Sequence, residues 1–263
     1  MVQLAIDAHV HLYPNFDLHT AFTGAINNFA AWRSPVNSRS LLLLTERYDC
    51  QFFDRLESLA STIGFLFQRL PQREAVRITN PDQQELFLFS GRQIVTRESL
   101  EVCALACSIQ IPDRQTPALE VIRRVQETGG IPALNWAPGK WLFQRGKVVA
   151  HLLQACRPEE LLIGDTSMRP TFWAMPWLMR RARRLGFRMI AGSDPLPFAG
   201  EEKNLGRYGC CLQAEWQDDQ PVSSLRHALL HSSHELERRG RRSSSLEFFR
   251  RQSRIMREKK NRT

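Results

Sequence analysis

The chain has no stretch of about 18 or more uncharged apolar residues, so we expect no membrane-spanning helix. Its first residues lack the basic region, apolar run and small-residue cleavage site of a secretory signal, so export is not expected. The six cysteines contain no CxxC pair, and four lie within or beside apolar segments, as reduced and buried thiols do. Together these absences predict a cytoplasmic protein without disulfides.

The positive charge of the chain is unevenly distributed. The formal net charge is +9, but residues 235–263 contain eleven Lys or Arg and only four Asp or Glu. The rest of the chain has 25 Lys or Arg and 23 Asp or Glu, which makes it almost neutral. The high isoelectric point is therefore a property of the C-terminal segment and carries no information about the substrate of the main domain.

The pattern of apolar residues predicts one α/β domain. A chain of 263 residues suits a single barrel-sized domain, and no internal repeat is evident. Apolar runs alternate with amphipathic stretches, as in βα units around a parallel sheet. The predicted strands are apolar on both faces, which indicates that both faces are covered. Seven strands are predicted, at residues 4–8, 41–45, 100–105, 131–135, 161–164, 188–191 and 208–213.

Two segments depart from this alternation. Residues 75–97 contain short alternating apolar runs around a Ser90-Gly91 turn, which we interpret as a β-rich insertion. The basic C-terminal segment predicts a helical tail. The expected organisation is a barrel-like domain over residues 1–238, including the insertion, followed by a tail over residues 239–263. Helices are predicted at residues 49–67, 117–128, 147–156, 173–185 and 223–238.

The most informative motif is Asp7-Ala-His9-Val-His11, at the end of the first predicted strand. Residues at positions i, i+2 and i+4 of a strand point to the same side, so these three side chains can converge. Two imidazoles beside a carboxylate are suitable ligands for a divalent cation. The alternative is a polar strand end that is only hydrogen-bonded.

Three carboxylates lie where later strands begin or end, and we expect them to join the histidines as metal ligands. Glu101 falls in an apolar strand, where a carboxylate is costly unless it is paired or binds a metal; Glu98 is the alternative if that strand begins earlier. Asp165 and Asp194 close two further strands, at the edge where active sites of parallel barrels collect. The competing interpretations are a helix cap for Asp165 and a turn residue for Asp194.

These motifs make the chain resemble the PHP family, the polymerase and histidinol phosphatase domains, and more distantly the amidohydrolase barrels. The residues that carry the resemblance are the Asp7–His11 motif, Glu101, the segment 129–135 and Ala191-Gly-Ser-Asp194. The resemblance implies a distorted TIM-like (β/α)7 barrel that binds metal ions and hydrolyses phosphoesters. It also implies that His9 and His11 bind a metal, that Glu101 bridges or ligates, and that Asp194 is a late ligand.

The chain departs from the family pattern at two histidines. Asn135 stands where the family has a histidine after Gly-Gly, and Leu196 stands where the family has one after Gly-Ser-Asp-x. No histidine occurs between His19 and His151. The resemblance therefore implies one or two divalent ions (Mn, Zn or Fe) in place of the three that the family can bind.

The predicted function is a metal-dependent hydrolase of phosphoesterase type that acts on a small anionic substrate. The predicted proton acceptor is Asp194, or less favourably Asp165, and the cation would activate a bound water. Lys140, Arg145 and Arg169 follow predicted strand ends and are candidates to bind the anionic substrate. Because two family histidines are missing, the alternative is a PHP-like module that has lost catalysis and serves in binding or regulation.

Two other features have alternative interpretations. His227, His231 and His234 fall on one face of a predicted helix, where a polar face is favoured over a metal site because no carboxylate motif accompanies them. The basic tail can contact nucleic acid or an anionic membrane surface, or can be a solvated terminus.

Overall fold

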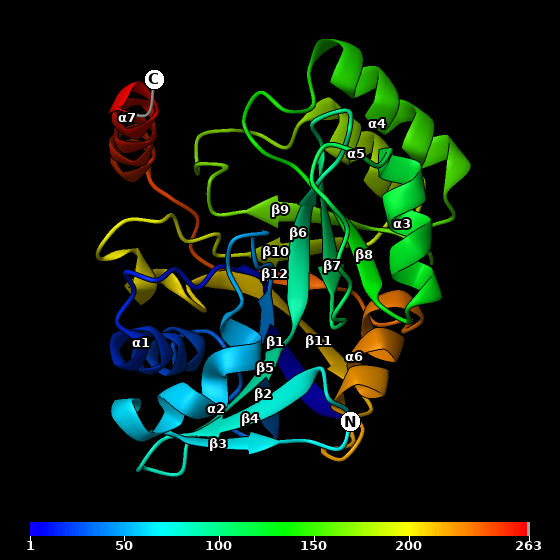
Figure 1. Ribbon diagram of the computed structural model, residues 1–263. Coiled ribbons are helices and arrows are strands. Elements are labelled where there is room, and N and C mark those ends of the chain that lie inside the picture. Colours follow the sequence, from blue (N-terminus) through cyan, green and yellow to red (C-terminus); the bar gives the residue numbers. More distant parts are fainter. Residues whose placement is uncertain (262–263) are drawn as a thin grey trace.

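The computed structural model describes residues 1–261 and shows a mixed α/β protein, which confirms the predicted class (Figure 1). Its strands form two hydrogen-bonded sheets, with the orders β12-β11-β1-β2-β5-β4-β3 and β10-β9-β8-β7-β6. The strands are β1 (Val2–Val10), β2 (Ser38–Leu44), β3 (Leu66–Arg69), β4 (Ala75–Thr79), β5 (Glu85–Phe89), β6 (Gly91–Val95), β7 (Glu101–Leu105), β8 (Ile131–Asn135), β9 (Leu162–Thr166), β10 (Met189–Gly192), β11 (Tyr208–Ala214) and β12 (Glu237–Gly240).

Helices cover the outer faces of both sheets (Figure 1). Helices α1 and α2 pack on the larger sheet, and α3, α4 and α5 pack on the smaller one. Alternate strand residues of both sheets face each other and form a common apolar interior. The helices are α1 (Leu18–Ala30), α2 (Phe52–Ile63), α3 (Ala118–Glu127), α4 (Phe143–Ala155), α5 (Trp177–Arg184), α6 (Pro221–Leu230) and α7 (Ser245–Asn261), with a short 3-10 helix η1 (Glu201–Asn204).

The two sheets meet at two seams. At the first, the N–H of Asp194, just after β10, donates to the carbonyl of His9 in β1 at 2.9 Å. At the second, the N–H of Glu46, just after β2, donates to the carbonyl of Gly91 in β6 at 3.0 Å. Strands of both sheets, including β5 and β11, therefore surround one interior.

The sheets are mixed, whereas the sequence pattern predicted parallel strands. Strand β11 is antiparallel to β1, and β7 is antiparallel to both β6 and β8. Around β7 the difference arises in the segment between β2 and β7, which supplies strands to both sheets: β4 and β5 form a hairpin, β5 extends the larger sheet beside β2, and β6 pairs with β7 to start the smaller one. The predicted insertion, residues 75–97, is thus part of both sheets.

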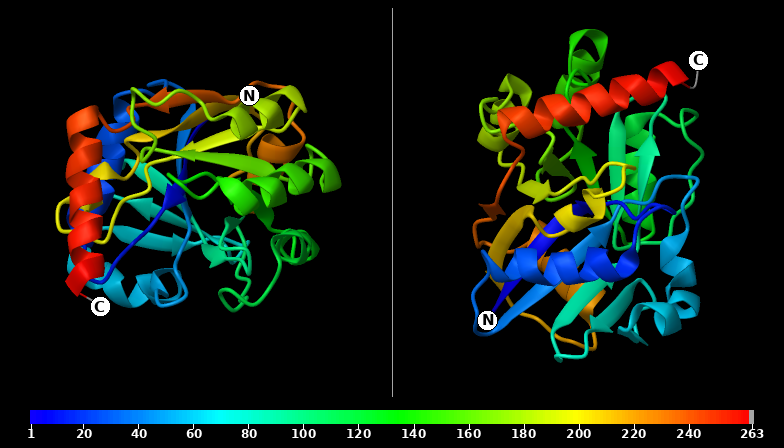
Figure 2. Two further views of the ribbon diagram at one scale, coloured as in Figure 1. Left: turned by 90° about the horizontal axis from the view of Figure 1, so that it is seen from above. Right: turned by 90° about the vertical axis from the view of Figure 1, so that its left-hand side faces the viewer.

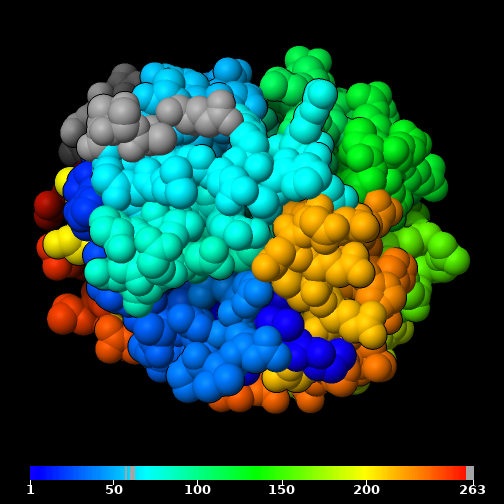
Figure 3. Space-filling model, turned by 90° about the horizontal axis from the view of Figure 1, so that it is seen from below, coloured from blue at the N-terminus to red at the C-terminus, as the bar shows by residue number. Residues whose placement is uncertain are grey.

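One end of the interior is closed by α6 and the segment before it. Leu225 and Leu229 of α6 belong to the apolar interior. The ring of Trp216 packs against Phe87 of β5 with centroids 5.3 Å apart. Figure 3 shows this face, where the segment before α6 (gold) lies directly against the strands β4 and β5 (cyan to teal). The open edge of the interior is therefore at the opposite end, where the parallel strands finish.

The C-terminal segment is packed against the domain as far as the structure describes it; residues 262–263 of the predicted tail lie outside the described part. Strand β12 crosses the expected boundary at residues 238 and 239 and pairs with β11. Helix α7 then runs as a straight rod along one side of the molecule (Figure 2). Its Arg251 is buried, at 7% exposure. This segment therefore contributes to the folded core despite its charge.

Two expectations about composition can be compared with the structure directly. Within residues 1–261, no helix is both long and apolar enough to cross a membrane. All six cysteines are buried and free, and Cys210 and Cys211 are neighbours within β11.

Candidate metal centre

A bulge in β1 lies where the side chains of His9 and His11 are directed into one site. The three steps from Asp7 to Val10 on β1 match only two steps on β2, so β1 holds one extra residue there. An extra residue shifts the side chains that follow it relative to those before it. The two imidazoles lie beyond Asp7, and the Nε2 atoms of His9 and His11 are 3.0 Å apart.

Asp194 reaches these imidazoles from the seam between β10 and β1. Its Oδ1 lies 3.6 Å from Nε2 of His9 and 3.7 Å from Nε2 of His11. The imidazole side chains are 4% and 5% exposed, whereas that of Asp194 is 19% exposed, so the site opens to solvent on the Asp194 side. In residues 1–261, these three form the one group of His, Cys, Asp or Glu whose ligand atoms lie within 4.8 Å of one another.

The geometry of this triad fits a divalent ion. A triangle with sides of 3.0, 3.6 and 3.7 Å has a point about 2 Å from every corner, close to the ~2.0–2.2 Å bonds that zinc makes with nitrogen and oxygen. Two neutral imidazoles and one carboxylate are also a donor set that zinc, iron and manganese accept. The exposed side leaves room for a water or substrate ligand.

The close approach of β10 to β1 depends on glycine. A Cβ atom on Gly192 would lie 2.3 Å from the backbone nitrogen of His9, so only glycine fits there. The carboxylate of Asp7 stabilises this contact, because it accepts hydrogen bonds from the N–H groups of Ser193 and Gly206 at 2.8 Å each. Burial raises the pKa of Asp7 to about 6 despite these bonds. Asp7 is therefore bonded to the backbone and lies outside the metal triad.

The pKa shifts of His11 and Asp194 favour the forms of these two residues that bind metal. Burial, followed by the charge of His9, lowers the pKa of His11 to about 3, so His11 is neutral near pH 7. Burial alone would raise the pKa of Asp194, but His9, His11 and Arg251 outweigh it and hold the pKa below its ordinary value. A neutral imidazole and an ionised carboxylate are the protonation states that a cation needs.

The low pKa of His11 predicts a contribution to stability that is lost in acid. In the unfolded chain His11 gains a proton near pH 6.5, whereas in the fold it gains one only near pH 3. Between these values the unfolded state binds more protons, so stability falls as the pH falls, by at most about 1.4 kcal/mol per pH unit. In urea denaturation with chelator, His11→Gln should have a shallower slope over this range than the wild type. His151→Gln, at an exposed position of α4, should keep the wild-type slope; equal slopes in both variants would contradict this account.

Asn135 supports the triad from the neighbouring strand, and the sequence analysis did not assign it this role. It lies at the end of β8, and its Nδ2 is 2.9 Å from Nδ1 of His9. The two ends of an Asn amide are assigned from hydrogen bonding and are nearly the same shape. With its oxygen toward His9, Asn135 would accept the Nδ1–H and leave Nε2 free for a metal. The only sequence signal for this role is that Asn135 replaces a family histidine.

Glu101 is placed at the same edge, but it is paired with a cation. Because β7 runs antiparallel, its first residue lies level with the last residue of β8, and Glu101 pairs in register with Asn135. The carboxylate of Glu101 forms an ion pair with the ammonium of Lys140. These side chains are 14% and 32% exposed, respectively. Glu101 is thus adjacent to the triad through Asn135, without being one of its three members.

Asp165 and Arg169 are placed away from the histidines. Side chains alternate along a strand, and Gly164 faces Asn135, so Asp165 faces the other way. Its carboxylate is fully buried and accepts two bonds from Arg169, at 2.8 and 2.5 Å, and one from Tyr208 at 3.1 Å. Arg169 is itself 3% exposed. The structure therefore brings these two predicted site residues to each other and not to the triad.

Two arginines complete the surroundings. Arg145, a predicted substrate residue, donates to the carbonyl of Gly139 at 2.9 Å and thereby braces the loop that carries Lys140. Arg251 of α7, which sequence reasoning missed, donates to the carbonyl of Asp194 at 2.7 Å. Nothing in the sequence separates Arg251 from the other basic residues of the tail, because its role depends on where α7 packs.

Comparisons with known proteins concern the fold. No protein-family profile matches the sequence, and no curated protein matches it either. The structure is similar to PsfC from Pseudomonas syringae PB-5123, with a TM-score of 0.54 and 14% identity, over 98% of this chain and 99% of that one. It is also similar to a two-domain protein from Bacteroides vulgatus that contains a predicted PHP-like metal-dependent phosphoesterase. That match has a TM-score of 0.51 and 14% identity, over 91% of this chain and 65% of that one.

A weaker likeness extends to Endonuclease Q in complex with a 27-mer duplex. It covers 89% of this chain and 58% of that one, at a TM-score of 0.45 and 10% identity. The chain therefore shares its fold with a protein that contains a predicted PHP-like domain, in line with the resemblance seen in the sequence.

Proposed function

We propose that this protein is a metal-dependent hydrolase of phosphoesterase type, with one divalent ion bound by His9, His11 and Asp194. The observation that carries the proposal is the buried triad, whose three ligand atoms are spaced as the corners of a metal coordination sphere. The likeness of the fold to a PHP-like protein supports the reaction class. A single ion is proposed because Glu101 and Asp165 are occupied by Lys140 and Arg169.

An ion bound there would lower the pKa of a coordinated water and polarise a phosphoryl oxygen. The protein's own groups have distinct tasks in this proposal. Asn135 fixes the tautomer and orientation of His9. Asp194, whose pKa is held low, is a good anionic ligand and a weak proton acceptor, so we assign it the role of ligand. Lys140 presents its ammonium at the same edge and would hold an anionic oxygen of the substrate.

The test is hydrolysis of two model esters by protein stripped with chelator and then supplied with Mn, Zn or Fe separately. p-Nitrophenyl phosphate reports on monoesterase activity, and bis(p-nitrophenyl) phosphate reports on diesterase activity. We expect turnover only after metal is restored, and none in Asp194→Asn. Metal binding without turnover of either ester would instead support the alternative of a PHP-like binding module. Equal turnover by Asp194→Asn and the wild type would refute the proposed centre.

Asn135 provides a test of the site that does not need a substrate. Asn135→Leu keeps the approximate size of the side chain and removes its hydrogen-bonding groups. Loss of such a supporting partner typically weakens metal binding by about 10- to 100-fold. Asn135→Asp retains an acceptor for the Nδ1–H of His9 and should bind zinc at least as tightly as the wild type. Titration calorimetry with zinc measures both variants, and equal weakening in the two would show that Asn135 does not act through His9.

Lys140 is the residue through which substrate charge can be tested. Lys140→Met removes the ammonium but keeps most of the side-chain length. A hydrogen bond to a charged group contributes about 1.5–3 kcal/mol, so kcat/KM for p-nitrophenyl phosphate should fall by roughly tenfold or more. Lys147→Met, at an exposed position of α4, should leave kcat/KM unchanged. Similar values for the two variants would remove Lys140 from the proposed site.

A further inference from the structure

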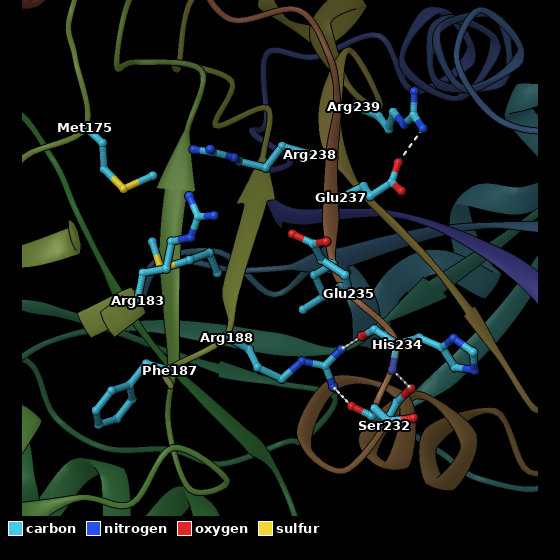
Figure 4. A pocket seen from close by; sticks show the side chains of 13 residues that line it. Met175, Arg183, Phe187, Arg188, Ser232, His234, Glu235, Glu237, Arg238 and Arg239 are labelled. Atoms are coloured by element: carbon cyan, nitrogen blue, oxygen red, sulfur yellow. Dashed lines mark hydrogen bonds and ion pairs between the residues drawn. The ribbon is translucent and has the colours of Figure 1, made fainter. Parts of the chain in front are cut away.

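A second cavity lies on the flank of the molecule, and none of its lining residues belongs to the metal triad. It is bounded by the end of α5, the start of β10 and residues 232–239, which include most of β12 (Figure 4). Its volume is about 690 Å³, within the range of sites for small organic ligands. We call it the flank cavity.

The flank cavity is lined by two guanidinium groups from separate elements. Figure 4 shows Arg183 from α5 and Arg238 from β12 extending into the same part of this space, with Glu235 on the side toward Arg188. The side chains of Arg183 and Glu235 have no hydrogen-bond or ion-pair partner in the part of the chain that the structure describes. Arg183 is thus a cation that faces a cavity without a counter-ion.

Positive charge is also in excess behind the side of the cavity that carries Arg238. The carboxylate of Asp165 is bonded to both Arg169 and Arg238. Arg242 lies beside them, and burial together with the charge of Arg169 lowers its pKa. Three guanidinium groups therefore lie around a single buried carboxylate, which is bonded to two of them. Added negative charge in the cavity would offset this repulsion.

A further cation is fixed at the base of the cavity. Arg188 donates to the carbonyls of Ala228, Ser232 and His234 at 2.7–2.9 Å, so its position is set by the backbone. No carboxylate neutralises it among the described residues. Its charge therefore adds to the field that an anion in the cavity would meet, at no cost in ordering the side chain.

The remaining surfaces favour a ligand that is more than a bare anion. Phe187 and Met189 line the cavity but are almost completely buried in the apolar cluster that α5 covers, so its accessible apolar side chains include Met175, which points into the cavity from its rim (Figure 4). Glu235 offers a carboxylate acceptor, which repels an anion but accepts hydrogen bonds from hydroxyl or amino groups. A ligand with an anionic end, hydroxyl donors and a flat apolar part matches the guanidinium groups, the Glu235 carboxylate and the apolar side chain of Met175, respectively.

We propose that the flank cavity binds a nucleoside phosphate at a site separate from the metal centre. The phosphate lies between Arg183 and Arg238, where two guanidinium groups can donate to its oxygens. The base packs over Met175, and the ribose hydroxyls donate to Glu235. This inference does not rest on the proposed hydrolase function, because it uses none of the residues of that site.

The experiment is calorimetric titration of the full chain, free of divalent metal, with AMP, adenosine and inorganic phosphate. We expect saturable binding of AMP that is tighter than that of either part. Arg183→Gln should weaken AMP binding by about tenfold or more, because it removes a charge-assisted contact. Arg181→Gln is the matched control, one cation removed from the same helix at a position that does not line the cavity. Arg183 is exposed, so its replacement leaves the fold intact.

Two further variants locate the site. The double variant His9→Ala/His11→Ala should bind AMP as the wild type does, which separates this site from the metal centre. Glu235→Gln should weaken AMP binding while leaving phosphate binding unchanged or stronger. Absence of saturable AMP binding below about 1 mM would overturn the proposal. Equal affinities in Arg183→Gln and Arg181→Gln, or loss of binding in the double histidine variant, would overturn it as well.

Discussion

The double variant His9→Ala/His11→Ala is expected to lose divalent metal completely. Protein purified without chelator should contain about one equivalent of Mn, Zn or Fe, and the variant should contain only traces. The reason is geometric: two of the three corners of the coordination triangle are removed, and a single carboxylate binds a transition metal weakly. Metal analysis by mass spectrometry measures the content directly.

A second readout is the stabilisation of the fold by metal. An ion present at about 100 times its dissociation constant stabilises the native state by about 2.7 kcal/mol, so Tm should rise on metal addition in the wild type. The double variant should show no rise. His227→Ala/His231→Ala is the matched control, because it removes two exposed histidines, one in α6 and one directly after it, whose rings lie 5.9 Å apart. If the control loses the metal and His9→Ala/His11→Ala retains it, the centre has been misplaced.

Replacing Arg251 with methionine is expected to destabilise the fold strongly. The guanidinium donates to Oε2 of Glu201 at 2.8 Å, and both side chains are at most 9% exposed. It also donates to the hydroxyls of Ser167 and Ser243 at 3.0 and 3.1 Å. Removal of one partner of a buried ion pair typically costs about 3–5 kcal/mol, because the other charge remains buried and unpaired.

The same replacement should weaken metal binding. Asp194 has a φ of 49°, in the left-handed region that residues other than glycine rarely adopt, and Arg251 donates to its carbonyl. We expect this bond to help hold Asp194 in the orientation that faces the imidazoles. Zinc titration of Arg251→Met under conditions in which it remains folded should show a higher dissociation constant than the wild type.

Two companion variants make this prediction specific. Arg251→Met/Glu201→Gln removes both charges and should recover much of the lost stability. Arg254→Met lies on the same helix, where its guanidinium sits 4.3 Å from the centroid of the Phe198 ring. A cation–π contact of that kind contributes about 0.5–1 kcal/mol, so its loss should be much smaller. Urea denaturation that gave equal losses for Arg251→Met and Arg254→Met would show that the buried pair has no special role.

The strands that carry the site were predictable because their signal is local. β8 was predicted with the bounds that the structure has, and the predicted β1, β9 and β10 overlap the observed ones. Each is a short apolar run with a polar residue at or just after its end. Such a run indicates a central strand that is buried on both faces. The prediction for α6 was too long: it ends at Leu230, and the chain then forms β12, because pairing with β11 overrides local helical preference.

The sequence by itself determined the class of the fold, the strand that carries His9 and His11, and the position of Asp194 after a later strand. These follow from the local alternation of apolar and polar residues. Only the tertiary structure decided that β7 runs antiparallel, that Asp165 turns toward Arg169, and that α7 packs over the seam. Those outcomes depend on contacts between residues far apart in the chain. A local sequence pattern does not encode the energies of such contacts.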